Sequence, residues 1–193
     1  MRDINGYQDE YINNPFEEHL IIYRHRKAAE YLHKEKAKNI LEVGCGLRPL
    51  YEYYHEFESL VIVEPSDVFC EKVDQNKPEN VKIIQSELNE SLINELKGQF
   101  DFILISSLLH ELEFPADLMR TAIAIANPKT KFHINVPNAK SFHRMLALKM
   151  GLINTLYDKS ERQHRYQQNR TFDLDSLTHF LQNCGLIIES KGS

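Results

Sequence analysis

A carboxylate and two glycines come together in the segment Asn39–Leu50, NILEVGCGLRPL. Glu42 lies within a short apolar run, and Gly44 and Gly46 follow that run directly. Glycine allows the backbone to turn sharply and allows a ligand to approach without meeting a Cβ atom. A carboxylate that is buried in such a run needs hydrogen-bonding partners. The segment therefore predicts a strand followed by a ligand-binding turn, in which Cys45 is a small packing residue and not a nucleophile.

A second carboxylate, Glu64, ends the apolar run LVIVE, eighteen residues after Gly46. At the end of a buried strand, an acid can accept hydrogen bonds from the two vicinal hydroxyls of a ribose. A dinucleotide would also need a small residue three positions after the second glycine, where this chain has Pro49. Proline is bulky there, although it is acceptable in the first turn of a helix. The spacing therefore indicates a nucleoside-containing cofactor and weakens the case for a dinucleotide.

Short apolar runs rich in Val and Ile alternate with segments of helical length. The runs predict strands that are buried on both faces, at Ile40–Val43, Leu60–Val63, Val81–Ile84, Phe100–Ile105 and Phe132–Val136. The segments between them predict helices at Leu50–Phe57, Asp67–Asp74, Glu90–Lys97 and Pro115–Ala126. This alternation indicates an α/β protein with a Rossmann-like, doubly wound, mostly parallel sheet and helices on both faces.

Both ends of the chain add helices to this pattern. Apolar spacing predicts an amphipathic helix from Phe16 to about Glu35, with Pro15 in its first turn. After Pro137, the segment AKSFHRMLALKMGL predicts a helix. The segment FDLDSLTHFLQNCG predicts another, capped by Asp173 or Thr171 and closed by glycine, and LIIES predicts a last strand.

The composition limits the classes of function. The chain has 193 residues, of which 42% are hydrophobic and 26% are charged, as in an ordinary globular domain. Its net charge of −5 argues against nucleic acid as a partner. No apolar run approaches the ~20 residues that span a bilayer, and the N-terminus has no secretory signal. The three cysteines stand far apart, so we expect reduced thiols, a cytoplasmic protein and no metal site.

The motif LEVGCG resembles the first motif of class I S-adenosylmethionine-dependent methyltransferases, roughly (D/E)-x-G-x-G-x-G, with Arg48 in place of the last glycine. Further landmarks follow in the family's order over residues 38–138, in VIVEPS, VKIIQ, FDFILISSLLHEL and INVPN. By this resemblance Glu42 helps to hold the methionine end of the cofactor, Glu64 the ribose, and the loop after VKIIQ the adenine. The implied cofactor-binding residues are Glu42, Gly44, Cys45, Gly46, Glu64, Pro65, Ser66, Ser86, Glu87, Leu88, Ser106 and Leu108.

The resemblance also implies a division of one methyltransferase-like domain, 1–193. Residues 1–37 form an N-terminal helical lid with Tyr23, Arg24 and Arg26; 38–138 form the cofactor-binding core; 139–170 form a variable acceptor-side segment; 171–193 form the last helix and strand. The family closes its sheet with two strands after the fifth; here the sequence predicts only one, so we expect the final strand to be missing. A partner chain could cover the sheet edge that this exposes, which would give a homodimer.

Catalytic and acceptor-side candidates follow the fourth and fifth strands. His110 lies just past the fourth strand, where a neutral imidazole could take a proton from a hydroxyl or amine, although a histidine at a helix start often does no chemistry. The sequence HEL is not a zinc motif, because Phe114 stands where its second histidine would be. The acceptor-side candidates are His143, Arg144, Tyr157, His164 and Arg165.

The expected activity is methyl transfer from S-adenosylmethionine, with S-adenosylhomocysteine as product, to an oxygen or nitrogen of a small molecule. Two alternatives remain open at this point. One is a non-catalytic cofactor-binding or interaction domain with the same fold, and the other, less favoured, is an NAD-dependent oxidoreductase.

Overall fold

We describe the protein from a computed structural model in which residues 15–159, 163–164 and 168–192 are described. The chain divides into two compact units. The sheet unit comprises Met1–Ser106 and Asp117–Asn135, and the C-terminal unit comprises Ser107–Ala116 and Val136–Ser193. Each unit is described by itself.

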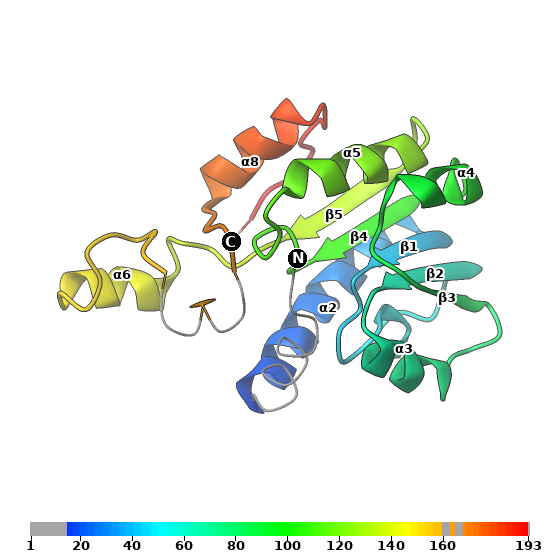
Figure 1. The fold of residues 1–193 in the computed structure, drawn as a ribbon, viewed down its shortest axis with the longest axis horizontal. Coiled ribbons are helices and arrows are strands. Elements are labelled where there is room, and N and C mark those ends of the chain that lie inside the picture. The colour runs from blue at the N-terminus through cyan, green and yellow to red at the C-terminus, as the bar shows by residue number, and fades with distance from the viewer. Residues whose placement is uncertain (1–14, 160–162, 165–167, 193) are drawn as a thin grey trace. The chain divides into compact units, whose positions relative to one another are not determined.

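The sheet unit contains a five-stranded, all-parallel sheet in the order β3-β2-β1-β4-β5 (Figure 1). Its strands are β1 (Asn39–Val43), β2 (Ser59–Glu64), β3 (Val81–Gln85), β4 (Phe102–Ser106) and β5 (Lys131–Asn135). The predicted strands are therefore confirmed to within about two residues at each end. Strand order reverses between β1 and β4, and open α/β sheets bind ligands beyond the carboxyl ends of the strands at such a point.

Helices cover both faces of this sheet. The chain runs from β1 to β2 to β3 in one direction and from β4 to β5 in the other, so right-handed crossovers place α3 (Asp67–Asp74) and α5 (Pro115–Ile125) on opposite faces. The N-terminal helix α2 (Pro15–Glu35) contacts β4 and β5. The predicted doubly wound architecture is confirmed.

The core beneath α2 explains why a carboxylate enters the interior. Ala28 and Leu32 of α2 pack in one buried cluster with Ile40, Phe102 and Leu104 of the sheet. Side chains two residues apart on a strand share a face. Glu42 therefore lies on the same face as Ile40 and extends into the layer beneath α2.

Two predicted helices are shorter than expected. The segment Leu50–Phe57 forms only a three-residue 3-10 turn, η1 (Leu50–Glu52), and Glu90–Lys97 forms η2 (Glu90–Leu92) followed by α4 (Ile93–Leu96). Aromatic residues are weak helix formers, and here they have other partners. The buried Tyr54 donates its hydroxyl hydrogen to Ala37 O at 2.7 Å, which draws the chain into the core and ends the turn.

The C-terminal unit contains α6 (Phe142–Lys149) and α8 (Leu174–Asn183), as predicted. Asp173 caps α8 as expected, because its side chain accepts a hydrogen bond from Ser176 N at 2.7 Å. The predicted last strand is wrong: residues 186–190 form no strand, and Ile187 is 91% exposed. The backbone N–H of Leu186 donates to Leu181 O at 3.1 Å, so it closes the helix end and does not pair with a neighbouring strand.

Candidate functional site

The turn after β1 has the backbone shape that its glycines permit. Gly44 has φ 77° and Gly46 has φ 58°, both in the left-handed region that L-residues rarely adopt. A Cβ atom added at Gly46 would meet nothing within 4 Å, so open space lies in front of the turn. At Gly46, therefore, glycine is required by the backbone conformation, and the space beside it is available to a ligand. We call residues 44–49 the glycine turn.

Glu64, the last residue of β2, is buried and its carboxylate faces the glycine turn. Its Oε2 accepts a hydrogen bond from Gly46 N at 3.2 Å, and its Oε1 accepts one from Ser66 N at 3.0 Å. Ser66 in turn caps α3, because its Oγ accepts from Phe69 N at 3.1 Å. Residues predicted from two separate motifs, Gly46 from LEVGCG and Glu64 and Ser66 from VIVEPS, thus meet at one edge of the sheet.

Cys45 is 5% exposed, and its Sγ lies 3.8 Å from Glu64 Oε2. Burial raises the pKa of this thiol well above its usual value, and the neighbouring Glu64 and Glu42 carboxylates raise it further. A thiol kept protonated in this way is a poor nucleophile. The geometry agrees with the predicted packing role.

The Glu42 carboxylate is 2% exposed and joins segments on both sides of the glycine turn. Its Oε2 accepts a hydrogen bond from Leu50 N at 3.0 Å, and its Oε1 lies 3.4 Å from Nε2 of His25 in α2. His25 was not among the residues selected from the sequence. The signal that could have revealed it is a polar residue within the buried stripe of α2, four residues after Ile21 and seven before Leu32.

The loop after β3 lies next to Glu64 through its backbone. Ser86 N donates to Glu64 O at 3.1 Å, and the Ser86 hydroxyl donates to Glu87 O at 2.8 Å. Leu88 is buried, whereas the Glu87 side chain is exposed. The structure therefore brings this predicted adenine-side loop to the end of β2.

A polar pair ends the two strands on the other side of β1. Asn135 Nδ2, at the end of β5, donates to Ser106 Oγ, at the end of β4, at 3.0 Å. Because all strands are parallel, this pair lies at the same edge of the sheet as the glycine turn. The sequence placed the segment INVPN at this edge without selecting Asn135.

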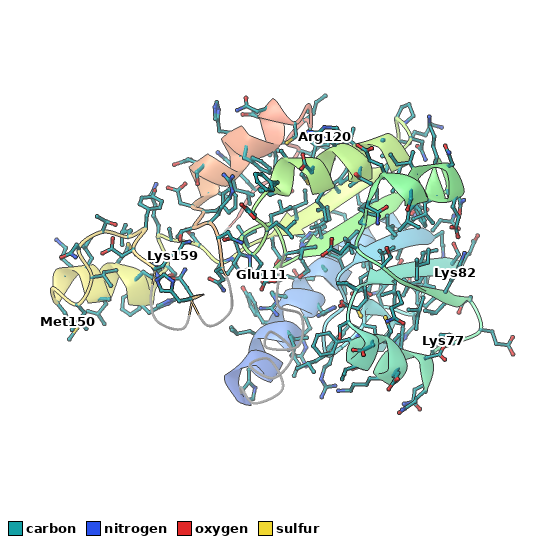
Figure 2. The ribbon with its side chains drawn as sticks, in the orientation of Figure 1. Lys77, Lys82, Glu111, Arg120, Met150 and Lys159 are labelled. Atoms are coloured by element: carbon teal, nitrogen blue, oxygen red, sulfur yellow. The ribbon has the colours of Figure 1, made fainter. Side chains whose placement is uncertain are left out.

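Leu108 and His110 belong to the C-terminal unit. His110 is 3% exposed, and its Nε2 lies 3.8 Å from Oε1 of the adjacent Glu111, which is marked in Figure 2. The carbonyl of His110 accepts hydrogen bonds from the backbone N–H groups of Asn169 and Arg170, both at 2.9 Å. The buried His110 and Glu111 side chains thus lie side by side, in a loop that is held by hydrogen bonds from residues 169 and 170.

Two acceptor-side candidates hold the loop that follows α6. Arg144 donates from Nε to Leu156 O at 2.9 Å and from Nη1 to Gln163 Oε1 at 3.1 Å. The Tyr157 hydroxyl donates to Asp173 Oδ2 at 2.8 Å. Of the remaining candidates, the His143 and His164 side chains are exposed, and Arg165 lies outside the described residues.

Asp173 contacts residues on both sides of α6, and we call residues 140–157 the α6 segment. Besides Tyr157, it forms an ion pair with Lys140, with Nζ 2.5 Å from Oδ2. The Lys140 ammonium and the Ser176 hydrogen bonds hold the pKa of the Asp173 carboxyl well below its usual range. Between Lys140 and Tyr157, large apolar side chains are exposed. Met150, which directly follows α6, is labelled in Figure 2. The exposed residues are Phe142, Met145, Leu146, Met150 and Leu152.

A family model described as a methyltransferase domain matches residues 16–191. The chain belongs to this family. The predicted class I S-adenosylmethionine-dependent methyltransferase family is confirmed, and S-adenosylmethionine is the cofactor of that family. No curated protein sequence matches this methyltransferase domain.

Solved structures share its fold at low sequence identity. The plantazolicin methyltransferase BpumL, solved in complex with SAH, is 14% identical with a TM-score of 0.62, and the match covers 93% of this chain and 74% of that one. The methyltransferase domain of bacterial CtHen1 is 16% identical with a TM-score of 0.59, over 84% of this chain and 82% of that one. A possible histamine N-methyltransferase from Thermotoga maritima is 17% identical with a TM-score of 0.58, over 93% and 80%. Identities this low establish the fold alone.

The described residues lack two other kinds of feature. Within residues 15–159, 163–164 and 168–192, no helix is long and apolar enough to cross a membrane. The same part of the chain contains no group of three His, Cys, Asp or Glu side chains arranged to hold a metal ion.

Proposed function

We propose that this methyltransferase domain moves a methyl group from S-adenosylmethionine to an oxygen or nitrogen atom of a small-molecule acceptor. The observation that carries the proposal is the contact between Glu64 and Gly46. It places an acid beside two left-handed glycines, at the carboxyl edge of a parallel sheet and next to the reversal of strand order.

The residues at this edge fit the cofactor. The open space at Gly46 lets a ligand approach the backbone, and the neighbouring Glu64 carboxylate would accept hydrogen bonds from the ribose hydroxyls. The loop from Ser86 to Leu88 adjoins Glu64 and would border the adenine. When bound, S-adenosylmethionine supplies a methyl group on a positively charged sulfur, which is a strong electrophile.

The chain's own task is then to orient the acceptor and to exclude water. An attacking atom must be held ~3–3.5 Å from the carbon that it attacks, in line with the leaving atom. For an acceptor that keeps its proton at neutral pH, the residue that we propose as general base is His110. The name of one structural neighbour, a possible histamine N-methyltransferase, is compatible with a small amine as acceptor.

The decisive test is binding of the full-length protein to S-adenosylmethionine, S-adenosylhomocysteine and NAD by titration calorimetry. We expect both adenosyl sulfur compounds to bind and NAD not to bind. Because charge-assisted hydrogen bonds are lost, Glu64→Ala should weaken S-adenosylhomocysteine binding by about tenfold or more. The matched control is Glu79→Ala, an exposed acid in the loop before β3, which should bind as the wild type does.

Other results would redirect the assignment. Binding of NAD alone would favour the oxidoreductase alternative. Cofactor binding without methyl transfer to any member of a broad panel of hydroxyl and amine acceptors would favour the non-catalytic alternative. Equal affinities in wild type and Glu64→Ala would mean that the ribose is held elsewhere.

A further inference from the structure

Helix α2 presents a histidine in the stripe of side chains that it buries against the sheet. Ile21, Ala28 and Leu32 of this stripe are apolar and at most 3% exposed, and His25 lies among them at 5% exposed. An imidazole is costly to bury unless its nitrogens find partners. The partners of His25 therefore indicate why a histidine occupies this position.

Three contacts fix the His25 ring. Its Nδ1 lies 3.0 Å from Ile21 O, one helical turn earlier, and its Nε2 lies 3.4 Å from Glu42 Oε1. The ring also stacks on Tyr53, with 4.9 Å between centroids and 21° between planes. Tyr53 immediately follows η1, so the ring lies between the end of β1 and the segment that follows the glycine turn.

The Glu42 carboxylate links this histidine to the glycine turn. Glu42 precedes the turn and Leu50 follows it, and Glu42 Oε2 accepts the hydrogen bond of Leu50 N. The Glu42 carboxylate thus connects the two ends of the glycine turn through Oε2, while its Oε1 faces His25. We propose that His25 is a positioning residue: by fixing the Glu42 carboxylate, it holds the glycine turn in its cofactor-binding shape and couples the docking of α2 to cofactor affinity. This inference rests on the proposed function, because the ligand it concerns is the adenosyl cofactor.

The physical basis is preorganisation. Two glycines give the turn more accessible backbone conformations than two L-residues would, and a ligand must select one of them. If the binding shape is populated only a fraction of the time, the apparent affinity falls by that fraction. Removing the His25 imidazole takes away the group that packs against Glu42 Oε1, so the Glu42 side chain is free to move and the turn loses its support.

The same helix provides a matched control. His33 Nδ1 lies 3.4 Å from Glu56 Oε1, and its ring lies edge-on to Tyr54 with centroids 4.9 Å apart. His33 therefore has the same kinds of neighbour as His25, a glutamate and a tyrosine. Its side chain is 52% exposed, however, and Glu56 has no place in the glycine turn.

The experiment measures the affinity of the full-length protein for S-adenosylhomocysteine in His25→Gln, His25→Asn and His33→Asn. The glutamine amide reaches about as far as His Nε2 and can still donate to Glu42, whereas the shorter asparagine cannot. We expect His25→Asn to bind about fivefold or more weakly, and His25→Gln and His33→Asn to bind within about twofold of wild type. A difference of less than about twofold between the affinities of His25→Asn and His25→Gln would overturn the proposal.

A double-mutant cycle separates positioning from a general loss of stability. If His25 acts through Glu42, adding His25→Asn to Glu42→Gln should weaken binding little beyond Glu42→Gln alone. Additive losses would overturn the proposal. Failure of the wild type to bind would instead refute the proposed function, and equal binding by wild type and both His25 variants would refute only the role of His25.

A second measurement applies if His25→Asn does not fold. By reciprocity, a cofactor favoured by docked α2 must stabilise the docking of α2. Hydrogen exchange of the α2 backbone around residues 21–29 should therefore slow when S-adenosylhomocysteine binds to the wild type. Unchanged exchange in this helix at saturating ligand would overturn the proposal.

Discussion

Glu64 in the sheet unit and Asp173 in the C-terminal unit are both buried carboxylates, but their partners differ in kind. Glu64 accepts hydrogen bonds from the backbone N–H groups of Gly46 and Ser66. Asp173 also caps a helix, yet two of its partners, Lys140 and Tyr157, are side chains from distant parts of its unit. The Glu64 carboxylate thus fixes the backbone of a turn, whereas the Asp173 carboxylate holds together segments that are distant in the sequence.

This difference matches what each region leaves exposed. Around the glycine turn, Glu42, Cys45 and Glu64 are all buried, so the turn is held before any ligand arrives. Around α6, the ends are tied to Asp173 while the helix between them exposes Phe142 and its apolar neighbours. The first region is therefore fixed in shape by its buried side chains, whereas the second has fixed ends and an exposed apolar surface between them.

Substitution of one glycine in each region should give the largest difference between the two regions. Gly46 in the glycine turn and Gly151 after α6 have φ of 58° and 70°, and an added Cβ would meet nothing within 4 Å at either position. Valine at either site should therefore lower the free energy of unfolding by a similar amount, about 1–3 kcal/mol, through backbone strain. Only Gly46→Val should also abolish measurable S-adenosylhomocysteine binding, because its side chain fills the space before the turn.

Chemical denaturation and calorimetry on the two glycine variants check this prediction. Gly151→Val serves as the control for strain alone. If Gly151→Val weakened cofactor binding as much as Gly46→Val does, the loss would reflect destabilisation and not an occupied site.

Asp173 provides the corresponding test in the C-terminal unit. Asp173→Asn should lower the free energy of unfolding at pH 7 by about 2 kcal/mol, because the helix cap and the charge-assisted bond to Lys140 are weakened. The pKa of this carboxyl is held below its usual value by Lys140 and Ser176. Its contribution is therefore complete above the unfolded-state pKa of about 3.9 and is lost as the pH falls further toward the folded-state pKa.

The measurement is the difference in stability between wild type and Asp173→Asn, followed from pH 7 down to pH 2 by urea denaturation. Taking the difference removes the contribution of all other acids. The gap should be constant near neutral pH and should close in acid. A gap that stays constant down to pH 2 would show that the Asp173 charge does not stabilise the fold.

The sequence predicted the features that depend on local patterns. Continuous Val and Ile runs identified the buried strands, and the spacing from Gly46 to Glu64 located two residues that prove to be hydrogen-bonded. Asp173 was one of two predicted caps, with Thr171, and such a prediction is possible because capping involves residues only three positions apart. In each case the relevant partner is close in sequence or is set by the regular register of parallel strands.

Features that depend on distant partners were not predictable in this way. The role of His25 depends on Glu42, seventeen residues away, and the pattern of α2 shows only that position 25 is buried. The segment Leu50–Phe57 has helical length, but Tyr54 bonds to Ala37 O and ends the turn. Leu186–Ile188 has the composition of a strand, yet a strand needs a neighbouring strand, and Leu186 N bonds to the preceding helix instead.

Substitution of Tyr157 is the smallest change that alters the contacts between Asp173 and the α6 segment. Tyr157→Phe removes one hydroxyl and its hydrogen bond to Asp173 Oδ2, while Lys140 still balances the charge of that carboxylate. Because the Tyr157 side chain is 48% exposed, water can replace the lost donor, and we expect a decrease in the free energy of unfolding of at most about 1 kcal/mol. Cofactor affinity should not change. A decrease in the free energy of unfolding as large as that of Asp173→Asn would mean that the Tyr157 hydroxyl, and not the Lys140 ammonium, provides most of the stabilisation at Asp173. The attachment of the α6 segment would then depend on the loop after α6 more than on the residue before it.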